Sequence, residues 1–414
     1  MLRSSYLAAL DIGTAKVAAA IAEITPAEEF SVVGLGLAET SGVRRGAVVD
    51  CAAATGSIVR AIAQAELMAG VRVDRAHVGL SSSLVTGFNS RGVVSVAGDG
   101  HVITAADVAR AVEAAVAMQL PDGREIVHIL PQDFAVDDYE GITAPIGLTG
   151  IRLEANVYVA TVDVLRAQNV IDAVNGAGVA VCDLTLDALA ASEAVVSDQE
   201  KALGVALVDI GAGATHYAIF ERGALVRSGT VPIGGGHFTT AIAVTLCTPP
   251  PDAEKIKQRF GRAAPAPADD LEEIVVPSLG RKPARRMPHR MLSEILERQA
   301  AQLFHALQGE LFRHGFADAL AAGLVITGGG AIPGDITSVA ERVFDRPVRR
   351  GSPAGISGLV DEIRAPAYAT AVGLLRHADR HPVLAPLTHR GIGINAGRRF
   401  RDLFAAGRLA ARAS

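Results

Sequence analysis

The sequence has no tryptophan, and aromatic residues make up only 4% of its 414 positions. Such a composition leaves few rings for the stacking platforms that hold single-stranded nucleic acid. Basic residues are also in the minority, with 39 Lys and Arg against 44 Asp and Glu, and the formal net charge is −5. A generally basic coat for nucleic acid is therefore excluded, and we expect no nucleic acid partner.

Cysteine is scarce as well. Cys51, Cys182 and Cys247 are odd in number and form no CxxC pair, so the cysteines encode neither a disulfide framework nor a structural zinc site. A reducing cytoplasm fits this usage. At the N-terminus the apolar run Tyr6 to Leu10 is cut by Asp11 before it could form a signal-peptide core, so we expect no export.

Neither a membrane-spanning segment nor a clear metal motif is present. The charge-free stretch Ser228 to Pro251 contains Gly-Gly-Gly and Pro-Pro-Pro, which a bilayer-spanning helix would not carry. We expect any membrane contact to be peripheral. His377 and His381 have a helical spacing that suits a metal, but no carboxylate motif accompanies them, and we expect two surface histidines.

Glycine, in contrast, is abundant at 43 residues, which favours tight turns around a ligand. The segment Leu7 to Glu23 is predicted to form a strand, a turn at Asp11-Ile12-Gly13-Thr14 and a second strand. The same pattern returns at Gly204 to Glu221, about half the chain away. This spacing indicates a duplicated protein with two lobes that can close on one ligand, rather than a solenoid of short repeats.

Each of these glycine turns carries an aspartate at the end of its strand. Such a turn presents backbone N–H groups to an anion while the carboxylate points toward a cation, which is what phosphate and Mg²⁺ need. We expect Asp11 and Asp209 to hold Mg²⁺ through water and Lys16 to add a positive charge. One copy alone would suggest an ordinary turn, whereas two copies favour a phosphate site. The turn residues of the expected site are Gly13, Thr14, Gly211, Gly213 and Thr215.

A third glycine turn, Gly328-Gly329-Gly330, follows the predicted buried strand Leu324 to Thr327 and could let an adenosine lie against bare backbone. Glu254 and Lys257 share one face of a predicted helix. They could hold a ribose and an adenine edge, or they could form a solvated ion pair. Together with the phosphate turns, these segments predict ATP and Mg²⁺ as the ligands.

The order of these segments carries a resemblance. A phosphate turn, a linking helix at Leu186 to Val196, a second phosphate turn, an adenosine turn and a closing helix resemble the actin, Hsp70 and hexokinase superfamily. Within it the chain is similar to the FtsA family of bacterial actin homologues, from Tyr6 to about Arg376. The segments that carry the similarity are Asp11 to Val17, His128 to Pro131, Pro145 to Glu154, Gly234 to His237, Ala253 to Lys257 and Tyr368 to Leu374.

The resemblance implies an α/β protein with an actin-like two-lobed ATPase fold, a duplicated core and an FtsA-type inserted subdomain. It adds Gly235 and Gly236 to the nucleotide-binding residues. Glu193 falls near the position of a water-orienting residue, or it is a carboxylate on the helix surface, and we expect at most slow hydrolysis. The implied parts are lobe 1 core at 1–85 and 163–203, the insert (1C) at 86–162, lobe 2 core at 204–237 and 303–360, subdomain 2B at 238–302, a closing helix at 361–380, a flexible linker at 381–397 and a membrane-targeting helix at 398–414.

For function, the resemblance implies an adaptor on the cytoplasmic face of the inner membrane at midcell. It would bind ATP, self-associate into filaments, anchor polymers of the division tubulin FtsZ and help to recruit later division proteins. Two alternatives stay open, a type IV pilus assembly ATPase of the actin-like class and a small-molecule kinase.

Within subdomain 2B, five basic residues could attract an acidic and apolar FtsZ tail, or they could be a solvated charge run. These are Arg281, Lys282, Arg285, Arg286 and Arg290.

The C-terminal segment Gly397 to Ser414 combines apolar and basic residues. On a helical projection an apolar side opposes a basic side, and the segment charge is +4 in a chain of −5. This pattern predicts an amphipathic helix that binds anionic inner-membrane lipid. A helix docked on its own domain, or a disordered basic tail, is the alternative. The residues expected at the membrane are Arg398, Arg399, Phe400, Leu403 and Phe404.

Overall fold

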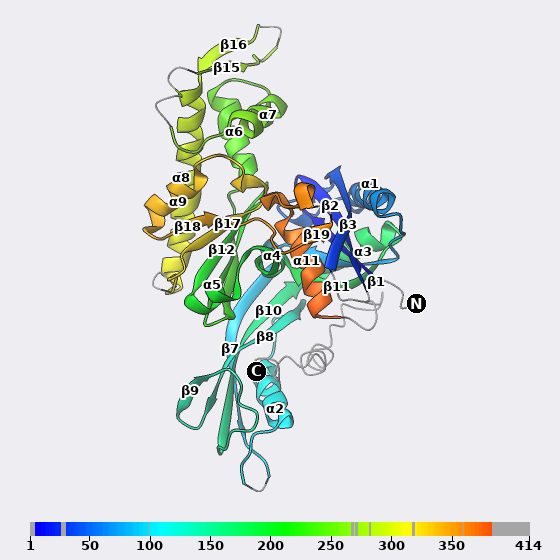
Figure 1. Ribbon diagram of the computed structural model, residues 1–414, viewed down its shortest axis with the longest axis vertical. Coiled ribbons are helices and arrows are strands. Elements are labelled where there is room, and N and C mark those ends of the chain that lie inside the picture. The colour runs from blue at the N-terminus through cyan, green and yellow to red at the C-terminus, as the bar shows by residue number, and fades with distance from the viewer. Residues whose placement is uncertain are drawn as a thin grey trace.

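The computed structural model describes residues 5–25, 30–98, 100–265, 269, 272–280, 283–316, 319–358 and 360–382. Two lobes lie side by side, and a slender domain extends from their junction to one end of the molecule (Figure 1). A small hairpin of the second lobe forms the opposite end.

The first lobe is built on a six-stranded sheet. In spatial order its strands are β11 (Ala180–Leu186), β6 (Arg75–Leu80), β1 (Ser5–Ile12), β2 (Lys16–Ile24), β3 (Phe30–Glu39) and β19 (Ser357–Gly358). Strands β1 to β3 form an antiparallel meander, and β6 then lies parallel to β1. The predicted glycine turn is therefore the hairpin between β1 and β2.

The second lobe repeats this arrangement in a five-stranded sheet. In spatial order its strands are β14 (Ala224–Val231), β13 (Thr215–Glu221), β12 (Val205–Ile210), β17 (Leu324–Thr327) and β18 (Val348–Arg350). Again three consecutive strands form an antiparallel meander, and the next strand lies parallel to the first. The shared topology confirms the duplicated core that the repeated sequence pattern predicts.

A separate four-stranded antiparallel sheet forms the slender domain (Figure 1). Its strands are β7 (Val85–Ser95), β10 (Arg152–Asp163), β8 (Arg124–Val136) and β9 (Tyr139–Ile142), and helix α2 (Ala105–Val116) packs on β7 and β10. Helix α2 begins with a capping box, because the Thr104 hydroxyl accepts from the Asp107 N–H and the Asp107 carboxylate accepts from the Thr104 N–H.

Helices cover both sheets. The helices of lobe 1 are α1 (Cys51–Ala69), α3 (Val164–Gly176), α4 (Asp187–Val195), α10 (Val360–Ile363) and α11 (Ala369–Arg380). The helices of lobe 2 are α5 (Asp198–Leu203), α6 (Gly235–Thr245), α7 (Pro250–Phe260), α8 (His289–Arg313) and α9 (Ile336–Phe344). Small hairpins are β4 (Val43–Arg44) with β5 (Ala47–Val48) and β15 (Glu273–Val276) with β16 (Arg285–Pro288). Among the described residues, none of these helices combines the length and apolar character that a membrane crossing requires.

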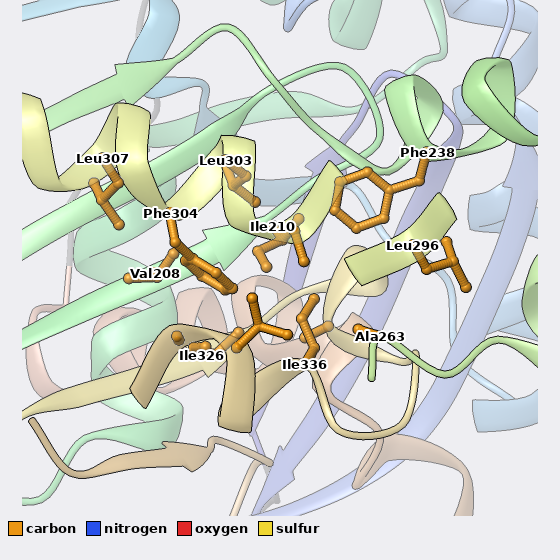
Figure 2. Close-up of a cluster of buried hydrophobic side chains, with 14 of the residues drawn as sticks. Val208, Ile210, Phe238, Ala263, Leu296, Leu303, Phe304, Leu307, Ile326 and Ile336 are labelled. Atoms are coloured by element: carbon orange, nitrogen blue, oxygen red, sulfur yellow. The ribbon is translucent and has the colours of Figure 1, made fainter. Parts of the chain in front are cut away.

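The core of lobe 2 fixes the strand that carries Asp209. Val208 and Ile210, the neighbours of Asp209 on β12, are fully buried against α8 and α9. Figure 2 shows Phe304 of α8 and Ile336 of α9 in this cluster. Because alternate residues of a strand point to opposite faces, burial of Val208 and Ile210 turns Asp209 away from this core.

The lobes meet at α4 and α11. Helix α4 contacts β12 and β13 of lobe 2 as well as β6 and β11 of lobe 1, and α11 packs along it. The two helices cross so closely that a Cβ atom at Gly373 would collide with the carbonyl oxygen of Ala190. Glycine at position 373 therefore sets the distance between these helices.

The prediction of two surface histidines is wrong for His377. This residue of α11 is only 7% exposed, because α11 is covered by α4 on one side and by the lobe 1 sheet on another. Its ring stacks on His381 with centroids 4.1 Å apart and meets His128 edge-on at 6.2 Å.

Replacing Gly373 by alanine is expected to destabilise the protein by about 1–3 kcal/mol, because the added methyl group overpacks the crossing. Thermal unfolding should show a lower midpoint. The matched control is Gly309→Ala, an exposed position of α8 where a Cβ atom meets nothing within 4 Å. That change is expected to be neutral or to stabilise by up to about 1 kcal/mol, since alanine is the better helix former. Equal effects of the two substitutions would contradict the packing argument.

Candidate functional site

A cavity of about 650 Å³ lies between the lobes. Both glycine turns, the third turn at Gly328–Gly330 and the first turns of α4 and α6 contribute to its wall. Its volume is within the range of small-ligand pockets. The expected site residues that line it are Asp11, Gly13, Thr14, Lys16, Asp209, Gly211, Gly213, Gly235, Gly236, Glu254, Lys257, Gly328, Gly329 and Gly330.

The two glycine turns have the same local geometry. Gly13 N–H donates to the Lys16 carbonyl at 3.0 Å, and Gly211 N–H donates to the Ala214 carbonyl at 3.0 Å. A Cβ atom at either glycine would lie 2.9 Å from the oxygen that accepts this bond, so both turns need glycine. The equivalent hydrogen bonds follow from the equivalent sequence and place an aspartate at the same point of each hairpin.

Three carboxyl groups converge on the cavity wall, those of Asp11, Asp187 and Asp209. Burial is the main cause that raises the pKa of each. Repulsion from Asp11 adds to the shift of Asp209, whose pKa rises to about 7 although Thr370 and Lys16 oppose the change. Repulsion from Asp11 and Asp209 raises the pKa of Asp187 further. Such a cluster favours a cation, because a cation stabilises the ionised form of all three groups.

Lys16 is the basic group next to these carboxyls. Its ammonium donates to the Ala367 carbonyl at 2.7 Å and lies 4.2 Å from the centre of the Tyr368 ring. Burial lowers the pKa of Lys16, while Asp11 and Asp209 oppose the shift. Lys16 thus joins the first turn to the segment that precedes α11.

At the other end of the cavity, Lys257 holds α7 against α6. Its ammonium donates to the Gly235 carbonyl at 2.9 Å, to the Thr239 hydroxyl at 2.8 Å and to the Glu254 carboxylate at 2.7 Å. Lys257 is only 8% exposed, so the pair is not the solvated surface pair that the sequence left open. These three bonds use all three N–H groups of the ammonium, so Lys257 has no donor left for an adenine edge.

Glu254 keeps its charge in this setting. Burial alone would raise its pKa, but the hydrogen bonds from Lys257 and Thr239 outweigh burial and the net shift is downward. The third glycine turn lies nearby on the cavity wall. Its first residue, Gly328, has a φ of +88°, and a Cβ atom there would collide with the carboxylate of Asp209. Glycine at this position therefore allows the third turn to approach the second phosphate turn.

The structure does not bring Thr215 and Glu193 to the cavity. The Thr215 hydroxyl donates to the Ile233 carbonyl at 2.7 Å beneath the second turn. Glu193 pairs with Lys201 at 3.2 Å and with Arg380. Its position on α4 gives no support to a water-orienting role.

Asp187 is the residue that sequence reasoning missed. It is the first residue of α4, where β11 ends at the cavity, and its Oδ1 has no hydrogen-bond partner among the described residues. A Cβ atom at Gly79 would collide with this carboxylate, so glycine there makes room for it. His128 of β8 fixes the helix start, because its Nε2 accepts from the Leu186 N–H at 3.0 Å. An aspartate at the boundary between a predicted strand and the linking helix was the available signal.

The basic residues expected at a partner surface are only partly described. Arg285 and Arg286 lie exposed on β16, and Arg290 lies exposed on α8. Arg285 donates to the Leu246 carbonyl, Arg286 pairs with Glu273 at 3.4 Å and Arg290 pairs with Glu294 at 2.9 Å. The residues predicted to contact a partner or the membrane that lie outside the described part of the chain are Arg281, Lys282, Arg398, Arg399, Phe400, Leu403 and Phe404.

The duplicated topology, the cleft and the paired turns define a two-lobed actin-like protein of ATPase fold. A chain of the PilM–PilN type IV pilus biogenesis complex has a TM-score of 0.65 and 17% identity, covering 90% of this chain and 98% of that chain. MreB 5 of Spiroplasma citri bound to AMPPNP has a TM-score of 0.54 and 15% identity, with 92% and 97% covered. At these identities the likeness shows the fold alone.

Sequence relatives then identify the family: the chain belongs to the FtsA family of cell division proteins. A family model described as "Cell division protein FtsA" matches residues 206–373, and one described as "SHS2 domain inserted in FTSA" matches residues 83–161. Cell division protein FtsA of Pseudomonas aeruginosa is 40% identical over 89% of this chain and 88% of its own length. That of Escherichia coli K12 is 36% identical over 89% of each chain. The resemblance and the fold class expected from the sequence are confirmed.

The carboxyl cluster predicts a pH-dependent stability of the nucleotide-free protein. Each of these carboxyls has a higher pKa in the folded protein than in the unfolded chain, so ionising it costs more free energy in the folded protein. The free energy of unfolding of the wild type therefore falls as pH rises from about 4 through the raised pKa values. Asp187→Asn removes one such group. We expect the variant to unfold at a higher temperature than wild type at pH 8, with a smaller difference at pH 5.

A matched control for this measurement is Asp74→Asn, because the Asp74 side chain is 86% exposed. It should follow the wild type at both pH values. A difference between Asp187→Asn and wild type that stays constant with pH would contradict the electrostatic explanation.

Proposed function

We propose that the cavity binds ATP with Mg²⁺ between the lobes. The observation that carries this proposal is the convergence of two glycine turns and their aspartates on one cavity beside Lys16. The turns offer backbone N–H groups to phosphate, and Asp11 and Asp209 offer the oxygen ligands that hydrated Mg²⁺ accepts. Similarity in fold to an MreB 5 structure bound to AMPPNP supports the choice of nucleotide.

The adenosine would lie between α7 and the third glycine turn. Glu254 is ionised and lines the cavity, so its carboxylate can accept hydrogen bonds from ribose hydroxyls. Lys257 acts as a brace that holds Glu254 in place, since its own donors are used. Gly235 and Gly236 at the start of α6 donate their N–H groups to the carbonyls of Gly211 and Ala212, both at 2.8 Å, so they would hold the second turn in place beside the phosphates.

For hydrolysis we propose Asp187 in place of Glu193 as the residue that orients water. Asp187 lines the cavity beside the two other aspartates, and its position is fixed at the start of α4. Bound Mg²⁺ would supply positive charge that neutralises the phosphates and the carboxyl cluster. His216 also lines the cavity, and burial lowers its pKa to about 4, which keeps the ring neutral there. We expect turnover to be slow.

In the cell we propose an adaptor role, supported by membership of the FtsA family. The chain would anchor FtsZ polymers at the cytoplasmic face of the inner membrane at midcell and help to recruit later division proteins. Subdomain 2B would bind the FtsZ tail through its basic residues, and the C-terminal segment 398–414 would bind anionic lipid. ATP-bound chains would assemble head to tail, since a heterologous contact propagates rather than closes. The family match gives the pilus and kinase alternatives no comparable support.

Asp209→Ala is expected to weaken binding of a fluorescent ATP analogue with Mg²⁺ by at least about tenfold, or about 1.4 kcal/mol. Wild-type affinity should also rise between pH 6 and pH 8, because Mg²⁺ favours the ionised form of Asp209 and its pKa in the empty cavity is about 7. The variant should lose most of that slope. Asp74→Ala, which removes a charge at an exposed site, serves as the control. An unaltered titration of Asp209→Ala would remove the claim.

The lipid-binding proposal is tested by sedimentation with anionic liposomes. Full-length protein should pellet, while Phe400→Glu combined with Phe404→Glu should stay in solution, because charge on the apolar side opposes insertion. Phe312→Glu is the matched control, since Phe312 is 62% exposed on α8 and far from this segment in the chain. Equal pelleting of the double variant and wild type would reject the anchor.

Head-to-tail assembly is tested separately by electron microscopy on a lipid monolayer with ATP. Rows of subunits would support it.

Reversing Arg285 and Arg286 to Glu should abolish binding of an acidic and apolar FtsZ tail peptide, because the basic surface of 2B then repels it. Fluorescence anisotropy at low salt is the measurement. Arg313→Glu, at the other end of α8, should bind as wild type does. Unchanged affinity of the double variant at low salt, where charge effects are strongest, would reject the assignment.

A further inference from the structure

A second group of titratable side chains lies in subdomain 2B, where the β15–β16 hairpin meets the start of α8. Asp269, Glu272 and His289 each offer one ligand atom, and these three atoms lie within 4.8 Å of one another. Asp269 is fully buried and His289 is 5% exposed, while Glu272 is exposed. None of the three lines the nucleotide cavity.

The orientation of His289 is set by its backbone and by one ring nitrogen. The backbone N–H donates to the Glu272 carbonyl at 2.9 Å, and Nε2 lies 2.6 Å from the Phe260 carbonyl oxygen. Because a carbonyl only accepts, Nε2 must carry the proton of this bond. Nδ1 therefore faces the two carboxylates, and it has no hydrogen-bond partner among the described residues.

The distances in the group distinguish a proton from a metal ion at its centre. Nδ1 of His289 lies 3.4 Å from the Asp269 Oδ1 and 3.3 Å from the Glu272 Oε2. A protonated Nδ1 would form a charge-assisted hydrogen bond of about 2.7–2.9 Å. Ligands of a tetrahedral Zn²⁺, each about 2.0–2.2 Å from the metal, lie about 3.4 Å apart. Both separations are longer than such a hydrogen bond and match the spacing of zinc ligands.

Asp269 is held by contacts with Ser293 and Arg262. The Ser293 hydroxyl donates to Asp269 Oδ2 at 2.9 Å and leaves Oδ1 toward the centre of the group. Arg262 directs its guanidinium to Asp335 at 2.9 and 3.1 Å and stays 3.5 Å from Asp269 Oδ1. The buried carboxylate is thus held by the Ser293 hydroxyl and by a long ion pair with Arg262. In metal sites a ligating histidine usually donates from its other ring nitrogen to a carbonyl or carboxylate, as Nε2 of His289 does to Phe260.

We propose that Asp269, Glu272 and His289 bind a Zn²⁺ ion that fastens the base of the β15–β16 hairpin to α8. One imidazole with two carboxylates suits zinc better than Mg²⁺ or Ca²⁺, which take oxygen ligands only. Water can fill the fourth position, as in zinc sites with three protein ligands. The metal would fix the strand that carries Arg285 and Arg286. This site is independent of nucleotide binding and needs no cysteine.

The test uses untagged full-length protein stripped of metal with a chelator and titrated with Co²⁺, which takes the tetrahedral geometry of Zn²⁺ and absorbs strongly in it. We expect one tetrahedral Co²⁺ per chain, displaced by Zn²⁺. Glu272→Gln should weaken binding at least about tenfold. It should fold as wild type does, since Glu272 is exposed. The matched control is Glu273→Gln, an exposed neighbour that pairs with Arg286 and lies outside the group.

Thermal unfolding gives a second readout, because a ligand that binds the folded state raises its stability. Zn²⁺ should raise the unfolding temperature of wild type and Glu273→Gln by more than that of Glu272→Gln, in which only the cleft carboxyls remain to bind it. The proposal would be overturned if the protein bound Co²⁺ only in octahedral geometry, if the two variants bound it equally, or if no metal bound.

Discussion

The close crossing of α4 and α11 at Gly373 holds together the helix pair on which the junction of the lobes depends. Helix α4 touches the sheets of both lobes, and α11 packs along it on the sheet of lobe 1. The same helix begins at the cavity with Asp187, and α11 contributes Thr370, which donates to Asp209 at 3.2 Å. Packing between the lobes and the shape of the site are therefore consequences of one helix pair.

Charge is the second constraint on the cleft. Burying Asp11, Asp187 and Asp209 together is unfavourable in their ionised forms, and Lys16 alone cannot balance three carboxylates. The proposed Mg²⁺ would relieve this repulsion, because a cation favours the ionised carboxyls. Each lobe holds part of the carboxyl cluster, so such a cation would interact with both lobes.

The two ends of the molecule lie away from this cleft. The hairpin of 2B stands at one end of the molecule and the inserted sheet at the other (Figure 1). His128 connects the inserted sheet to the nucleotide cavity, since the strand β8 that carries it supports the start of α4. A zinc ion at His289 would act on the 2B hairpin alone.

The sequence by itself determined the duplication, the two glycine turns and their aspartates, because these hairpins are made by residues adjacent in the chain. Tertiary structure decided which residue of α4 faces the cavity. Asp187 and Glu193 are six residues apart, about 240° around a helix, so they face different surroundings and only packing selects between them. The cluster at His289 likewise needs a loop, a hairpin and a helix start to meet. Such contacts depend on distant segments, which local pattern does not encode.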